Sequence, residues 1–421
     1  MSRSFTPKDA HVLMNALVHQ ATGQNGISVV DTSTFVSAGE TVLGTGVENT
    51  LNALSIVMGN LFMAVRPYNA KLTLIQAQNT NLYTSRLRKI SFYPSDTVEA
   101  GDWNTDLNTA NLYNGYDNNS HSTEGHTSVA SMWEQHKKAC VELNFAGQSV
   151  WDFPITIYEN QLKVAFRSEG EFIQFMNGLM VENSNDIEST KEAWNRMIIL
   201  NALGGCYDMK NTGSVRNLTK EYNTKFGTTY TSAELRTTYL ESFLKFFVSE
   251  FKLASNYMEE RKSIYHYNPV KVIDGVTHDK VLRHTSKADQ RVLLYNPLFI
   301  EAQANVLPTI FNTQFLDVGN YEGVDYWQSS TDAERASINV TPAIPDTSTG
   351  LQKAGDPVSL DYVIGMIYDK AALMTDFQFE SADSTPLEAR KRYRNVWYHN
   401  SKNAICDFSE NMIMFVMKDG D

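Results

Sequence analysis

Residues 85–205 carry the pattern that most restricts what this chain can fold into. Residues 86–93 mix β-branched and aromatic side chains with basic ones, as in a strand that is paired on one side and solvated on the other. Residues 139–145 and 153–158 alternate apolar and polar side chains, which is the period-two pattern of a half-buried strand. Because a long helical pattern follows directly, we predict an extended β-hairpin arm that leads into a helix.

The segment between these strands, residues 103–125, is rich in Asn, Asp, Ser, Thr and Gly. Fixing a backbone costs about 1 to 2 kcal/mol per residue, and the few apolar groups of this segment cannot offset that cost. We therefore expect this tip to lie on a neighbouring surface. Its apolar side chains are Leu107, Leu112, Tyr113 and Tyr116.

The helix after the hairpin starts at a capping box. Ser168 and Glu171 have the spacing in which the hydroxyl accepts a backbone N–H and the Glu side chain bonds back to the cap. We predict that the helix ends at Gly204-Gly205, and the pattern leaves open whether residues 183–186 divide it in two. Its apolar face consists of Phe172, Phe175, Met176, Leu179, Met180, Ile187, Trp194 and Ile198.

Further helices are indicated on both sides of this region. Residues 47–61 follow the helical apolar period, whereas residues 1–39 are mostly polar with one weak helical signal at 7–21, so we interpret them as an arm. Thr231 and Glu234 form a second capping box, before a helix of about seven turns. Its aromatic face, typical of a core rather than a cofactor site, consists of Leu235, Tyr239, Phe243, Phe246, Phe247, Phe251, Ala254 and Met258.

The C-terminal third contains short mixed elements followed by strands. We expect a short helix after Pro297 and a loop at 328–357, which is rich in Thr, Pro, Ser and Asp. The predicted strands are 291–295, 315–318, 362–368, 377–379, 395–399 and 412–417.

Composition and charge limit the class of protein. The 421 residues, 42% of them hydrophobic, allow about three domains and a sizeable core. Three widely spaced cysteines favour a reducing compartment, and no signal peptide or membrane-spanning run is present. A net charge of -12 argues against a large nucleic-acid-binding face. The dense basic run at 390–394 is better interpreted as a solvated strand approach or a salt-bridge patch between subunits than as a nucleic-acid contact.

No motif in the sequence defines a catalytic site. A P-loop, a dinucleotide fingerprint, a His-Glu-Xaa-Xaa-His motif and a Gly-Xaa-Ser-Xaa-Gly motif are all absent. His121 and His126 could hold a metal with nearby carboxylates, but histidines in such a polar loop are more often solvated. His399 fits a core or edge histidine better than a base, and the three carboxylates within 96–102 do not by themselves define a glycosidase pair. We therefore expect no metal, no cofactor and no enzymatic activity.

The segments 155–166 with 171–176, 292–299 with 315–318, and 367–374 with 396–399 carry a family resemblance. Together with the order of the parts, they resemble the major capsid protein of tailed bacteriophages, most closely those of small podoviruses that infect Bacillus. The tip at 103–125 and the loop at 328–357 look like expansions of that pattern.

The resemblance implies an α+β fold of the Johnson type, also called Hong Kong 97-like. The implied parts are an N-terminal arm and first helix at 1–84, an extended hairpin loop at 85–160, a spine helix and peripheral domain at 161–266, an axial domain with an inserted loop at 267–360, and C-terminal strands that return to both domains at 361–421.

The same resemblance implies the function of a structural protein. The chain would self-assemble in the host cytoplasm as hexamers and pentamers that form the icosahedral shell around double-stranded DNA. It would then be located in the virion. Expected partners are copies of itself, a scaffolding protein, a portal protein, auxiliary or decoration capsid proteins and nearby packaged DNA, with no membrane. The negative charge suits a shell lining past which DNA must slide.

Two alternatives to a capsid subunit stay open. A phage-borne or secreted glycan-binding or glycan-cleaving protein would account for the aromatic and Asn content, but it would favour repeated β patterning over two long capped helices. A soluble enzyme would need catalytic residues that the sequence does not reveal.

Candidate contacts between subunits lie on the arm and the basic run. They are Arg86, Arg88, Lys89, Trp103, Leu112, Tyr113, Tyr116, Arg390, Arg392 and Arg394.

Overall fold

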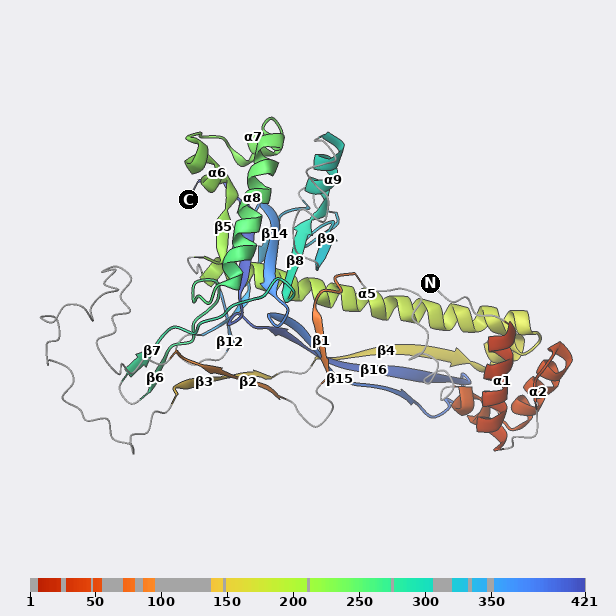
Figure 1. Cartoon of the computed structure of the whole chain (residues 1–421). Coiled ribbons are helices and arrows are strands. Elements are labelled where there is room, and N and C mark those ends of the chain that lie inside the picture. Colours follow the sequence, from red (N-terminus) through yellow and green to blue (C-terminus); the bar gives the residue numbers. More distant parts are fainter. Residues whose placement is uncertain are drawn as a thin grey trace, which may run out of the picture.

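The computed structural model shows an elongated α+β molecule in which a long helix and a sheet run side by side and a second sheet stands upright at one end of that helix (Figure 1). No helix within the described residues is long and apolar enough to cross a membrane. The structure describes residues 7–23, 28–46, 48–54, 71–79, 86–94, 138–146, 149–209, 213–273, 276–305, 320–331, 335–346 and 352–420.

The N-terminal region is more helical than its polar sequence indicated. The expected helix is α1 (Pro7–Thr22), and an unexpected second helix, α2 (Thr32–Gly44), begins at a capping box on Asp31. Residues 48–54 are helical, which confirms part of the helix expected at 47–61, and the rest of that range lies outside the described residues. These helices share a core with the start of the long helix, because Leu17, Phe35 and Leu54 are fully buried there.

The long helix, α5 (Glu169–Met209), follows a short helix, α4 (Glu159–Ala165). Ser168 Oγ accepts the backbone N–H of Glu171 at 3.2 Å, as the capping pattern predicted. The helix is continuous through residues 183–186, which answers the question that the sequence left open.

The predicted end of this helix at Gly204-Gly205 is wrong, because α5 continues to Met209. Both glycines lie where another part of the chain passes close to the helix. A Cβ atom on Gly204 would lie 2.7 Å from Cγ2 of Val340, and one on Gly205 would overlap the ring of Phe408. Here glycine allows close packing instead of ending the helix.

A four-stranded sheet lies along α5 (Figure 1). The long hairpin of its two central strands gives the molecule much of its length. Ile155, Ile157 and Val396 turn inward and are buried with Phe172 of α5. The strand order is β1 (Gln76–Asn79), β15 (Leu373–Ser384), β16 (Tyr393–Cys406) and β4 (Ser149–Tyr158), with β1 parallel to β15 and the other pairs antiparallel.

The upright unit is built on a five-stranded sheet. Every residue of β14 and β17 is buried, so these strands are covered on both faces. The sheet order is β5 (Val215–Asn217), β17 (Met412–Met417), β14 (Tyr362–Asp369), β8 (Gln290–Tyr295) and β9 (Tyr321–Val324).

Four helices belong to the upright unit: α6 (Leu218–Phe226), α7 (Ser232–Arg236), α8 (Leu240–Glu259) and α9 (Asn296–Asn305). The capping box on Thr231 is present, but its helix stops after one turn and α8 starts anew, so the single helix predicted there is two. The rings of Phe247 and Phe251 lie 5.8 and 5.6 Å from that of Phe415 on β17. Helix α8 therefore packs on the five-stranded sheet.

The predicted loop at 328–357 contains short strands within its described part. Asn201 of α5 pairs with the backbone of Ala343, accepting its N–H at 2.6 Å and donating to its carbonyl at 3.2 Å. The segment is thus fastened onto the long helix by tertiary contacts that its composition does not indicate. The strand expected at 315–318 lies outside the described residues. The short strands are β10 (Ile338–Val340), β11 (Ala343–Pro345) and β12 (Gln352–Ala354). Strand β11 pairs with β12, and β10 pairs with β13 (Val358–Leu360), which follows the predicted loop.

Candidate inter-subunit surfaces

The predicted arm is an antiparallel hairpin of β2 (Arg86–Phe92) and β3 (Cys140–Ala146). It lies at the end of the molecule opposite α1 and α2, near the small hairpin of β6 (Lys271–Ile273) and β7 (Val276–His278) (Figure 1). The segment 153–158, expected to return along the arm, belongs instead to β4 and pairs with β16. The hairpin therefore has two strands and stands apart from both sheets.

In β2, two large apolar side chains face outward and two polar side chains face the body of the chain. Ile90 and Phe92 point outward with 50% and 59% of their surface exposed. Lys89 and Ser91, on the alternate face, point toward the body of the chain, where Ser91 is 2% exposed. Since side chains of a strand alternate between faces, Ile90 and Phe92 are presented together on the outside.

Lys89 is held firmly within its own chain. Its Nζ atom pairs with Asp407, donates to Ser409 Oγ at 2.9 Å and lies 2.5 Å from Oε1 of Glu410. Asp407 and Ser409 are each only 2% exposed. Lys89 thus anchors the hairpin to the turn after β16, and sequence reasoning missed this because the partners lie more than three hundred residues away.

Arg88 lies on the outer face with the apolar pair. Its guanidinium contacts Oε2 of Glu142 across the hairpin at 2.5 Å and remains 60% exposed. An exposed cross-strand ion pair of this kind contributes little to stability, which leaves Arg88 available to other partners.

The basic run at 390–394 divides into exposed and buried members. Arg390 is exposed. Arg392 has a backbone φ of 52°, and its Nε atom lies 2.9 Å from Oε2 of Glu159. This contact is an ion pair, because it lacks the directional geometry of a hydrogen bond. Arg394 is 5% exposed and donates to Asn52 Oδ1 at 2.9 Å. Burial lowers the pKa of the Arg394 guanidinium. Arg394 therefore joins β16 to the N-terminal helices of its own chain.

The remaining predicted contact residues are not described by the structure. Trp103, Leu112, Tyr113 and Tyr116 lie outside the described residues, as do His121 and His126, and the side chain of Arg86 is not described.

Of the other residues considered for chemistry, His399 is described, whereas the carboxylates within 96–102 lie outside the described residues. His399 Nδ1 lies 2.6 Å from Oδ1 of Asp152, and its Nε2 lies 3.6 Å from Oδ2 of Asp383, on a partly exposed part of the four-stranded sheet. Among the described residues, no group of three His, Cys, Asp or Glu side chains could hold a metal ion.

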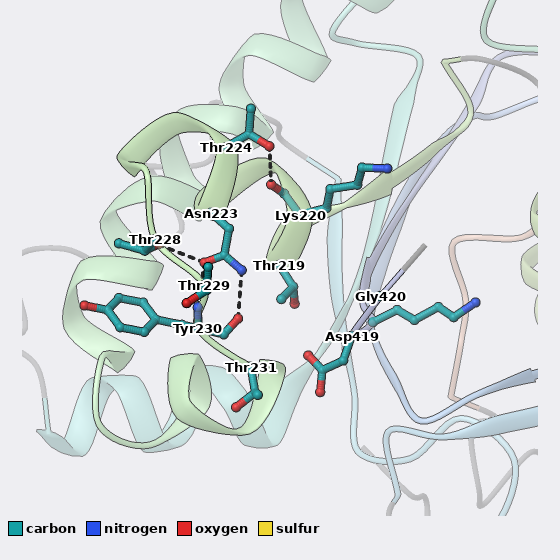
Figure 2. A pocket seen from close by; sticks show the side chains of 11 residues that line it. Thr219, Lys220, Asn223, Thr224, Thr228, Thr229, Tyr230, Thr231, Asp419 and Gly420 are labelled. Atoms are coloured by element: carbon teal, nitrogen blue, oxygen red, sulfur yellow. Dashed lines mark hydrogen bonds between the residues drawn. The ribbon is translucent and has the colours of Figure 1, made fainter.

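A polar hollow of about 550 Å³ lies between α6, α7 and the C-terminal residues (Figure 2). Asn223 fixes one wall, because its Oδ1 accepts from Thr228 Oγ1 at 2.8 Å and from the Tyr230 N–H at 3.0 Å. Asp419 fixes another wall by accepting the Ser232 N–H at 2.6 Å. The bonds of Asp419 with Ser232 connect the residues after β17 with α7, and those of Asn223 hold the segment between α6 and α7.

The sequence and the fold are similar to those of known phage capsid proteins. Residues 116–416 match the model of the Phi29-like phage major capsid protein family. The capsid structure of Staphylococcus phage Andhra is similar at a TM-score of 0.50, with 11% identity over 83% of this chain and 84% of that chain. The structure of the head fiber and inner core protein gp22 of native bacteriophage P68 has a TM-score of 0.48, with 10% identity over 83% and 85%. No curated protein matches the sequence.

The fold is therefore the α+β fold of a phage capsid subunit, which confirms the resemblance drawn from the sequence. The family match covers more than half of the chain. The chain belongs to the Phi29-like phage major capsid protein family, associates with copies of itself, and is located in the capsid of the virion.

Proposed function

We propose that the chain assembles as hexamers and pentamers into an icosahedral shell around double-stranded DNA, and that it acts as a structural protein without catalysis. The single observation that carries this proposal is the outward apolar face of the hairpin, with Ile90 and Phe92 half-exposed. Large apolar side chains that gather on a surface mark an interaction site, and aromatic anchors of this kind provide much of the binding energy at interfaces.

The partner of this face is a neighbouring copy of the chain. The inner face of the hairpin is held to its own body by Lys89 and by buried Tyr93 and Val141, whereas Ile90 and Phe92 on the outer face stay exposed within the described part of the chain. A shell subunit contacts copies of itself, so another subunit is the simplest partner for this face. Arg88, beside this face, would add a polar rim to the contact.

The domain assignments follow the two cores. We propose that α5 and the four-stranded sheet form the peripheral domain and that the five-stranded sheet with α6 to α9 forms the axial domain. The packing of α8 on Phe415 supports placing α8 in the axial domain, although it falls within the 161–266 segment expected to be peripheral. The boundaries at 84, 160, 266 and 360 stay predictions.

The remaining contacts and partners are proposals of the same kind. Arg390 and Arg392 are accessible for contact with a neighbour, and we keep Arg86, Trp103, Leu112, Tyr113 and Tyr116 as arm contacts. Lys89 and Arg394 would affect the contacts between subunits only indirectly, because their side chains bind residues of their own chain. Scaffolding, portal and auxiliary or decoration proteins would join assembly in the host cytoplasm, and the net charge of -12 would keep packaged DNA from adhering to the shell.

Assembly of a hairpin variant tests the proposal. Ile90→Ser with Phe92→Ser should leave the cooperative thermal melt of the subunit intact but abolish shells, tubes and capsomers in negative-stain microscopy, with or without a scaffolding partner. The matched control is Val12→Ser, an apolar residue that is 67% exposed on α1 at the opposite end of the molecule. Normal particles from the double variant would exclude the hairpin face as the principal contact.

A further inference from the structure

A small pocket with two cationic side chains adjoins the outer face of the β2–β3 hairpin. Its volume is about 360 Å³, and the described residues that line it are Phe92, Tyr93, Pro94, Lys138 and Arg261. Phe92 ends β2, Lys138 lies just before β3, and Arg261 lies just after α8. Three segments of the chain thus bring an aromatic ring and two cations to one place.

The wall formed by Tyr93 is held in place by its own chain. Tyr93 is 3% exposed and is buried with Val141 and Val281. Its hydroxyl donates to the Pro269 carbonyl at 2.8 Å, and its N–H donates to the Ala139 carbonyl at 3.0 Å. A wall that is already ordered in the single subunit lowers the entropy that a ligand must lose on binding.

The two cations of this pocket lack a counter-charge in the described part of the chain. Lys138 and Arg261 are exposed, and neither has a hydrogen bond or an ion pair with another described residue. No Asp or Glu is among the described lining residues. In contrast, Lys89 and Arg283 of the same region both contact Glu410. A ligand of the pocket would therefore supply the negative charge.

The lining fits a carboxylate that is carried beside an apolar group. A guanidinium such as that of Arg261 can hold both oxygens of a carboxylate, and the ammonium of Lys138 adds a further donor. Phe92, with 59% of its surface exposed, offers the apolar part of the contact. The phosphate backbone of DNA would satisfy the cations but would leave this ring uncovered, so an acidic protein segment fits better.

We propose that this pocket binds an Asp or Glu side chain, together with an adjacent apolar side chain, from a neighbouring copy of the chain. The chain carries 48 Asp and Glu against 36 Lys and Arg, so a second copy presents an excess of carboxylates to a pocket that has none. Phe92 also belongs to the outer face of the hairpin, so one neighbour covers both. The inference rests on the proposed function and names the chemistry of the partner surface.

A zero-length cross-link between copies tests the contact directly. Particles are assembled from equal amounts of unlabelled and 15N-labelled chain and treated with a water-soluble carbodiimide, which joins a lysine amine to a carboxylate in direct contact. Peptide mass spectrometry should find Lys138 linked to an Asp or Glu peptide, with about half of the linked pairs carrying one label only, as random mixing of copies requires. Lys138→Arg keeps the charge but removes the amine, so its particles should form without this link.

Charge reversal tests what the contact contributes to assembly. Lys138→Glu with Arg261→Glu should keep the cooperative thermal melt, because both side chains are exposed and unpaired within the described residues. The concentration needed for particles should rise by about tenfold or more, since like charges would then meet. The matched control is Lys8→Glu with Lys245→Glu, which makes the same change in net charge at two exposed positions on α1 and α8 and should assemble normally.

The possible results distinguish this contact from the shell function on which it rests. Normal wild-type particles without a Lys138 link between copies, or charge-reversed chains that assemble like the control, would overturn the pocket and leave the shell intact. Links confined to one chain would assign the pocket to its own subunit and equally overturn the proposal. A short DNA duplex that binds the unassembled wild type but not the charge-reversed chain would make it a nucleic-acid site instead. Failure of the wild type to form any particle, with or without scaffold, would overturn both proposals.

Discussion

His11 on α1 lies with its Nε2 atom 2.7 Å from Oε1 of Glu169, in the first turn of α5. Both side chains are mostly buried, at 19% and 16% exposed. The position of Glu169 also suits the positive end of the helix dipole. The N-terminal helices are therefore fastened to the start of the long helix.

The apolar start of α5 should be the most sensitive part of this junction. Phe172 is 1% exposed, with its ring 5.5 Å from Phe35 and 5.7 Å from Phe166. Phe172→Ala should lower the free energy of unfolding by about 3 to 5 kcal/mol, because it opens a cavity that this core cannot easily fill. The matched control is Gln174→Ala on the exposed side of the same turn, expected within about 0.5 kcal/mol of the wild type. Equal denaturant midpoints for the two variants would contradict this packing.

Two glycines of α5 should respond to alanine with opposite signs. Gly205→Ala should destabilise the fold by about 1 to 3 kcal/mol, because the added methyl group overlaps the ring of Phe408. Gly178→Ala should stabilise it by about 0.5 to 1 kcal/mol, because no atom lies within 4 Å of the new group and alanine is the better helix former. The stabilities of the Gly205→Ala and Gly178→Ala variants can be compared by thermal melts. A loss of stability in Gly178→Ala would show that the space around Gly178 is not open.

Stability should fall as the pH drops below the usual pKa of histidine. Burial lowers the pKa of His266, with Arg283 and Lys89 adding repulsion, below its usual value of 6.5. Between that value and the lowered one, the unfolded chain binds a proton that the folded chain refuses, so acidification favours unfolding. Above the usual pKa both states are neutral and the contribution is constant.

The variant His266→Gln should flatten this pH dependence, since glutamine does not titrate. Urea midpoints measured between about pH 8 and about pH 5.5 cover the relevant window. His284→Gln, at an exposed position, is the control and should keep the wild-type slope. Parallel slopes for wild type and His266→Gln would remove His266 as the cause.

The tip at 103–125 should contribute to assembly and not to folding. Replacing it with a short Gly-Ser turn should leave circular dichroism and cooperative melting unchanged, because its sequence offers few apolar groups to a core. Light scattering should then show subunits that fail to form particles. Loss of the folded signal would mean that the tip belongs to a core of its own chain.

Local patterns in the sequence indicated most of the long elements, but not α2 or the end of α5. The β-branched and aromatic content of residues 86–93 predicted β2, alternation predicted β3, and apolar runs predicted the buried strands β14 and β17. The cap at Ser168 and the capping box on Thr231 placed the starts of α5 and α7. These signals arise from bonds between residues a few positions apart, so the sequence alone contains them. The segments quoted for the resemblance, together with the order of the elements, indicated the capsid family.

Only the tertiary structure decided how those elements are used. Gly204 and Gly205 occur within α5 because Val340 and Phe408 approach the helix there, and nothing near them in sequence predicts that approach. Alternation in β2 could not say that Ile90 would face outward, because that depends on Lys89 reaching Asp407 on the distant turn after β16. Which face of a strand is covered depends on burial and charge pairing between segments far apart in the chain, and these are fixed only when the whole chain has folded.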